Sequence, residues 1–125
     1  CHELGMAMLL VTNDLGVVSG LADRIAVMYA GRIVESAEAA RFLAGPRHPY
    51  SAGLLAAVPS LDDAPGSELR TIAGTPPRPG AILPGCRFEP RCQHRQERCR
   101  SEDPAFITQG AAGIACHFPL HEAGQ

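Results

Sequence analysis

The residues best equipped for chemistry are four cysteines in the last third of the chain. The stretch PGCRFEPRCQHRQERC holds three of them and ACHF holds the fourth, which gives the spacing C-x5-C-x6-C-x16-C. They are Cys86, Cys92, Cys99 and Cys116. Common zinc modules pair cysteines as C-x2-C, and bacterial ferredoxins use C-x2-C-x2-C; neither pattern is present. The spacing alone therefore leaves a metal site, two disulfides or free thiols open.

Positive charge is interleaved with these cysteines. The arginines in question are Arg87, Arg91, Arg95, Arg98 and Arg100. One interpretation is a solvated charged face, which is how most charge runs behave. The other is an electrostatic role, because a guanidinium near a thiol lowers the thiol pKa. His94 and His117 stand beside cysteines, and we expect them outside the ligand set; Cys1 lies outside the pattern and is not expected to be a ligand.

Composition limits the partners and the compartment. The chain has 125 residues, a net charge of -2 and no lysine. Neither the charge nor a recognition-helix pattern points to nucleic acid, so we expect no such partner. The apolar run GMAMLLVT is far shorter than the roughly 18 residues of a membrane span, and no basic leader precedes it. We therefore expect a cytosolic location, where clustered cysteines are more often metal ligands or redox thiols than disulfides.

The first half reads as alternating strands and helices. The continuous apolar run 6–12 is typical of a strand buried on both faces, as in a parallel sheet. A helix should begin at Leu15 with Asp14 as its cap, and a strand should follow over 24–30. Gly31 predicts a tight turn into a returning strand. Short helices are expected over 37–45 and 48–58, so the fold class is α/β.

The second half changes in composition. Residues 59–83 are rich in proline, glycine and polar turn formers, which predicts a linker or an extended surface segment. Residues 84–120 hold the cysteines and few large apolar side chains. Such a segment buries little core, so we expect something else to hold it together.

Several strings in the first half resemble one known family. Thr12-Asn13-Asp14, Ala22-Asp23-Arg24 and Gly31-Arg32-Ile33-Val34-Glu35 are similar to the end of the ATP-binding subunit of ABC transporters. The strings Met28 to Arg32 and Pro46 to Tyr50 narrow the resemblance to importers of peptides (dipeptide, oligopeptide) or nickel. The resemblance runs from about Leu9 to about Pro119. It implies transmembrane permease subunits and a second ATP-binding subunit as partners, on the inner face of the cell membrane.

Asn13 departs from that family pattern. The resemblance implies a switch-loop histidine here, which contacts the γ-phosphate and helps to position the attacking water. An asparagine amide donates a hydrogen bond but carries no proton or positive charge. We therefore expect Asn13 to permit nucleotide binding better than hydrolysis. The alternative is that Asn13 only caps the following helix.

Other nucleotide-binding motifs are missing. A phosphate loop needs G-x-x-x-x-G-K-[ST], and a chain without lysine cannot contain one. Neither a Walker B run nor an ABC signature sequence is visible. We expect the isolated chain to be inactive, with ATP and Mg²⁺ bound only by a full-length parent subunit.

The resemblance also suggests a role for the cysteines. PGCRFEPRC, a third cysteine and ACHFP are similar to the C-terminal extension of peptide-importer ATPases, which implies a 4Fe-4S cluster on Cys86, Cys92, Cys99 and Cys116. Zinc is the alternative metal, because four thiolates suit both. The expected domains are the end of the ATPase domain over 1–58, a linker over 59–83 and the cysteine-rich extension over 84–120. Rival interpretations are a degenerate, non-catalytic family fragment and a free-standing metal-binding or redox module.

Overall fold

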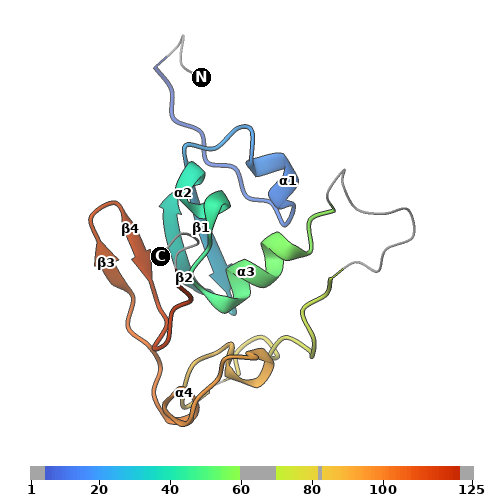
Figure 1. Ribbon diagram of the computed structural model, residues 1–125, viewed down its shortest axis with the longest axis vertical. Helices are drawn as coiled ribbons and strands as arrows, with labels where there is room; N and C mark the ends of the chain where they lie inside the picture. Colours follow the sequence, from blue (N-terminus) through green and yellow to red (C-terminus); the bar gives the residue numbers. More distant parts are fainter. Residues whose placement is uncertain (1–4, 60–69, 82, 122–125) are drawn as a thin grey trace.

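The computed structural model describes residues 5–59, 70–81 and 83–121. Its centre is a four-stranded antiparallel sheet in the order β1-β2-β4-β3, with helices packed beside it (Figure 1). The strands are β1 (Arg24–Tyr29), β2 (Arg32–Glu38), β3 (Ile107–Gln109) and β4 (Ala112–Ile114). A sheet with helices agrees with the predicted α/β class.

The hairpin β1–β2 forms as the sequence predicts. Along β1, buried and exposed residues alternate, so that Ile25, Val27 and Tyr29 face the core. The turn is Ala30-Gly31, whose φ angles of 47° and 81° are both positive. Two successive positive φ values match the right-handed twist of a two-residue hairpin, and glycine takes the second at no steric cost.

Three helices of the first half are also confirmed. They are α1 (Leu15–Val18), α2 (Ala39–Ala44) and α3 (Pro49–Ala56). The Asp14 carboxylate caps α1 by accepting from the Gly16 amide at 2.8 Å. Pro49 lies in the first turn of α3, where its missing N–H costs nothing. Phe42 of α2 is the most deeply buried aromatic of the described core, at 1% exposure.

The predicted buried strand over residues 6–12 is wrong. This segment forms no strand, and Leu9 and Val11 are 91% and 86% exposed. A strand buried on both faces needs a neighbour to pair with and helices to cover it. The sheet that the described residues form is antiparallel throughout and does not include this segment.

The second half contains elements that the sequence analysis did not predict. These are η2 (Glu89–Arg91), α4 (Glu97–Ser101) and the hairpin β3–β4. The described residues of the proline-rich segment, 70–81 and 83, form neither helix nor strand, as expected. Most of the polar stretch before them, 60–69, lies outside the described residues.

Sheet pairing and one buried aromatic side chain are two of the connections between the halves. β4 pairs with β2, with Glu35 opposite Ile114, and the Ala115 amide donates to the Val34 carbonyl at 2.9 Å. Phe88 is 4% exposed and lies against Tyr29 and Tyr50, with ring centroids 5.2 and 5.3 Å away. The cysteine-rich segment is therefore anchored by sheet pairing and by one aromatic side chain. Among the helices of the described residues, none is long and apolar enough to cross a membrane.

Candidate cysteine site

Three short elements position the four cysteines. Cys86 precedes η2, Cys92 follows it, Cys99 lies in α4, and Cys116 comes after β4. The Cys86 amide donates to the Cys99 carbonyl at 2.8 Å, which holds two of these elements together. Gly85 permits this approach, because a Cβ there would lie 2.2 Å from the Cys99 carbonyl oxygen.

All four cysteines line one cavity. The other lining residues are His48, Pro49, Phe88, Glu89, His94, His117 and Phe118. Cys99 is buried and the other three cysteines are half-buried, and all four are free thiols. Among the described residues, the four cysteines predicted as ligands therefore line one cavity, and none of them forms a disulfide.

Arginine is expected to lower the pKa of the thiols, but the pKa values of three of them are raised on balance. Burial raises the pKa of Cys86 and Cys92, and it raises that of Cys116 to about 11. The neighbouring cysteines raise all three further, because several thiolates in one cavity would repel one another. Arg95 lowers the pKa of Cys92 in part, but burial outweighs it.

The arginines are directed to oxygen atoms instead. Arg98 forms a two-pronged ion pair with Glu102, with both N···O distances at 2.7 Å. The Arg91 guanidinium donates to the carbonyls of Ile72 and Ala73 at 3.0 and 2.9 Å. Arg95 and Arg100 approach Glu89 at 3.9 and 3.4 Å, and Arg87 donates to the Ala30 carbonyl. These contacts favour the interpretation of a solvated, internally paired face.

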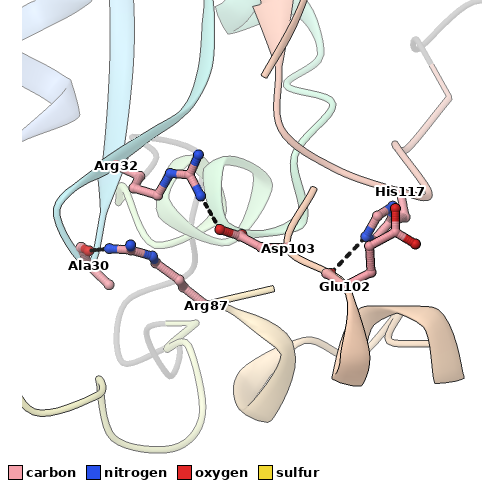
Figure 2. A network of polar contacts seen from close by, with 6 residues as sticks. All are labelled: Ala30, Arg32, Arg87, Glu102, Asp103 and His117. Carbon is pink, nitrogen blue, oxygen red and sulfur yellow. Dashed lines mark hydrogen bonds and ion pairs between the residues drawn. The ribbon is translucent and has the colours of Figure 1, made fainter. Parts of the chain in front are cut away.

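A polar network crosses between the first hairpin and the cysteine-rich segment (Figure 2). Figure 2 shows Arg32 of β2 directed at Asp103, and Arg87 directed back at Ala30 in the hairpin turn. His117 contacts the Glu102 backbone carbonyl at 2.9 Å, so it has a partner of its own. His94 is exposed and His117 is partly buried, and both line the cysteine cavity. That they lie outside the ligand set stays a prediction.

The donor set fits a group that takes four thiolates, since four free thiols share one cavity. Across residues 5–59, 70–81 and 83–121, no three His, Cys, Asp or Glu side chains are arranged so that they could hold a metal ion. The cluster and its ligands therefore stay predictions, and Cys1 lies outside the described residues.

Asn13 lies away from this site. It is exposed in the bend before α1, and Figure 1 shows α1 well separated from α4. The alternative that Asn13 caps the helix is wrong, because Asp14 supplies the capping oxygen. The switch-loop role of Asn13 is not tested by this geometry.

Sequence reasoning missed two buried polar residues that organise the site. The Glu35 carboxylate, 4% exposed, accepts from the backbone amides of Arg47 and His48 at 2.7 and 3.0 Å. His48, 1% exposed, accepts from the Tyr50 amide through Nδ1 at 3.1 Å and so caps α3. A charged residue within a strand and a histidine directly before the helix proline were the available signals.

The fold, and the sequence strings noted above for their resemblance to a known family, agree with a defined class of protein. The family described as "Oligopeptide/dipeptide transporter, C-terminal region" matches residues 34–99, and the chain belongs to it. It corresponds to the C-terminal part of the ATP-binding subunit of a peptide ABC importer.

Individual relatives match almost the whole chain. The oligopeptide transport ATP-binding protein OppD of Salmonella typhimurium is 43% identical over 97% of this chain and 36% of its own length. AppD of Bacillus subtilis, with the same description, is 39% identical over 99% of this chain and 38% of its own length. A putative peptide import ATP-binding protein of Brucella ovis is 47% identical over 85% of this chain and 33% of its own length. The chain thus spans about a third of the length of these relatives.

Proposed function

We propose that this chain is the C-terminal part of a subunit that binds ATP with Mg²⁺ and drives peptide import. The observation that carries the proposal is 39–47% identity to peptide-transport ATP-binding proteins along most of the chain. The proposed partners are transmembrane permease subunits and a second ATP-binding subunit, on the cytoplasmic face of the membrane. Within that subunit, residues 1–58 would form the end of the ATPase domain, and residues 84–120 would form the cysteine-rich extension. Residues 59–83 would be the linker between them.

Reconstitution tests this transport function. Vesicles containing the full-length subunit, its paired ATP-binding subunit and the permease subunits should take up labelled peptide only when ATP and Mg²⁺ are present. The isolated 125-residue chain should release no phosphate from ATP, because without lysine it has no phosphate loop. ATP-driven uptake of another solute, with none of peptide, would contradict the assignment.

We further propose that Cys86, Cys92, Cys99 and Cys116 hold a 4Fe-4S cluster. The shared cavity and the free state of all four thiols support this assignment. When bound, the cluster would supply a redox-active centre and a covalent clamp on a segment with little core of its own. The protein's part is to bury the sulfurs, limit water around them and bring together ligands from both ends of η2, from α4 and from the segment after β4. Because burial raises three of the thiol pKa values, ligation must supply the free energy that removes the protons.

Iron and sulfide analysis tests the cluster. Anaerobically purified chain should be brown, with about four irons and four sulfides per chain. Replacing any of the four cysteines by serine should lose or weaken the cluster, whereas Cys1→Ser is the matched control and should change neither colour nor iron content. Colourless protein with one tightly held zinc would replace the cluster by a zinc site. Metal-free protein that resists reconstitution, yet keeps residues 84–120 protected from protease, would contradict both the iron–sulfur cluster and the zinc site.

A further inference from the structure

The Cys116 segment, residues 115–120, is held at both ends by backbone hydrogen bonds. At one end the Ala115 amide donates to the Val34 carbonyl of β2 at 2.9 Å. At the other end the Leu120 amide donates to the Arg47 carbonyl at 2.8 Å. Cys116 lies between these two bonds, directly after the first. The path of the backbone that carries its sulfur therefore depends on where Val34 and Arg47 lie relative to each other.

Glu35 links the two residues that accept these bonds. It follows Val34 in β2, and its carboxylate accepts from the Arg47 amide at 2.7 Å and from the amide of the next residue at 3.0 Å. Arg47 is thus bonded on both sides, to Glu35 through its amide and to Leu120 through its carbonyl. The chain and these hydrogen bonds close a ring that runs from β2 through the Glu35 side chain and Arg47 to the Cys116 segment and back.

We propose that Glu35 is a positioning residue for the cysteine site: it fixes Arg47 against β2 and so sets the path of the Cys116 segment. This inference rests on the proposed four-cysteine site. Glu35 is not one of the residues that line the cysteine cavity, so it acts through the backbone of others. The second amide that it holds belongs to His48, which lines that cavity together with the four cysteines. One buried carboxylate therefore holds both the Cys116 segment and a part of the cavity wall.

A need to cap α3 does not account for Glu35. The His48 ring already caps this helix by accepting from the Tyr50 amide at 3.1 Å. Glu35 instead bonds the two residues that precede the helix, Arg47 and His48. Burying a carboxylate, which is 4% exposed here, costs free energy unless its oxygens are hydrogen-bonded, and these two amides are partners for them. A carboxylate has two acceptor oxygens for two donors, whereas an amide side chain has one.

Two substitutions break the ring at different bonds. Glu35→Gln keeps the size of the side chain but leaves one acceptor oxygen for two amides. Leu120→Pro removes the amide that donates to Arg47 and leaves Glu35 with both of its bonds, so it serves as the test even if Glu35→Gln does not fold. Ile25→Ala is the control for lost stability, because Ile25 is a buried core residue of β1 that lies outside the ring and outside the cavity lining.

The probe is Co²⁺ alone, titrated anaerobically into the reduced 125-residue chain, with thiolate-to-cobalt charge-transfer absorption as the readout. Glu35→Gln and Leu120→Pro should each weaken Co²⁺ binding roughly 10- to 100-fold, as when a group that orients a metal ligand is lost. Ile25→Ala should unfold at lower urea yet bind Co²⁺ nearly as tightly as wild type. Hydrogen exchange of the metal-free chain is the second readout: in Glu35→Gln, exchange at the Leu120 amide should accelerate by a larger factor than exchange at the amides of β1.

A double-mutant cycle tests whether the ring serves Cys116 in particular. In a Cys116→Ser background, Glu35→Gln should weaken Co²⁺ binding little further, because the ligand that Glu35 positions is already gone. In a Cys92→Ser background, Glu35→Gln should weaken Co²⁺ binding by the same factor as in the wild type, because Cys92 lies outside the ring.

Three results would overturn the positioning role alone. They are wild-type Co²⁺ affinity in Glu35→Gln or in Leu120→Pro, a loss of affinity in Ile25→Ala as large as that in Glu35→Gln, and an undiminished effect of Glu35→Gln in the Cys116→Ser background. Wild-type chain that takes up neither Co²⁺ nor iron would overturn the proposed site and this role with it.

Discussion

Glu35 offers a sharp test of how the buried polar groups hold the two halves together. Its carboxylate is 4% exposed and accepts two backbone amides, those of Arg47 and His48, at 2.7 and 3.0 Å. The substitution Glu35→Gln keeps the size of the side chain and removes its charge. A glutamine amide has one oxygen to accept with, so its NH₂ group must face one of the two backbone amides.

The expected cost follows from these two bonds. Hydrogen bonds to a charged group contribute about 1.5–3 kcal/mol each, and neutral ones about 1 kcal/mol. Glu35→Gln replaces two charged bonds by one neutral bond and leaves one buried amide without an acceptor. We expect a loss of about 2–4 kcal/mol in the free energy of unfolding. Glu35→Ala, which leaves both amides unpaired, should lose more.

Urea unfolding at pH 7 measures this loss, and Glu38→Gln is the matched control. Glu38 ends the same strand and is exposed, so its substitution should change the free energy of unfolding by less than about 0.5 kcal/mol. Hydrogen exchange at the amides of Arg47 and His48 should accelerate in Glu35→Gln alone. If Glu35→Gln costs no more than Glu38→Gln, the two bonds contribute nothing net, and the argument for a carboxylate-held entry to α3 is wrong.

Three other outcomes follow from the structure. Because burial lowers the pKa of His48 from 6.5 in the unfolded chain to about 4, its full contribution is present above pH 6.5 and is lost as pH falls toward 4. That loss, about 3 kcal/mol, should appear in urea unfolding across that pH range and disappear in His48→Gln. Gly85→Ala should lower the free energy of unfolding by about 1–3 kcal/mol, measured by thermal unfolding, because the added Cβ meets the Cys99 carbonyl. Gly20→Ala is the control, since a Cβ there meets nothing within 4 Å; equal losses in the two variants would contradict this. In a full-length subunit, Asn13→His should raise phosphate release about tenfold or more at unchanged nucleotide affinity, and unchanged turnover would remove Asn13 from the switch position.

Local signals predicted the first half well. The alternation in β1, the glycine of the hairpin turn and the Asp14 cap each depend on residues within a few positions of one another. The prediction of a buried strand over residues 6–12 failed because burial of a continuous apolar segment depends on partners elsewhere in the protein, which its own residues do not specify.

The cysteine site was predictable only in part. The strings around the cysteines indicated which residues to group, and the cavity brings all four together. The thiol pKa direction was missed because desolvation is set by tertiary packing, while the neighbouring arginines are directed to carbonyls and carboxylates. His48 comes from the first half and lines the same cavity as the four cysteines, and no local spacing in the sequence indicates this.

The pairing of β4 with β2 has a consequence for synthesis on the ribosome. Glu35 of β2 can pair with Ile114 of β4 only after Ile114 has been synthesised, 79 residues later. At about 5–20 residues per second, the ribosome needs roughly 4–16 s to make that stretch. During this interval the second edge of β2 presents unpaired amides and carbonyls, which is the kind of edge to which other chains add strands. The nascent chain therefore passes through a window in which aggregation competes with folding, and that window closes only when β4 has emerged.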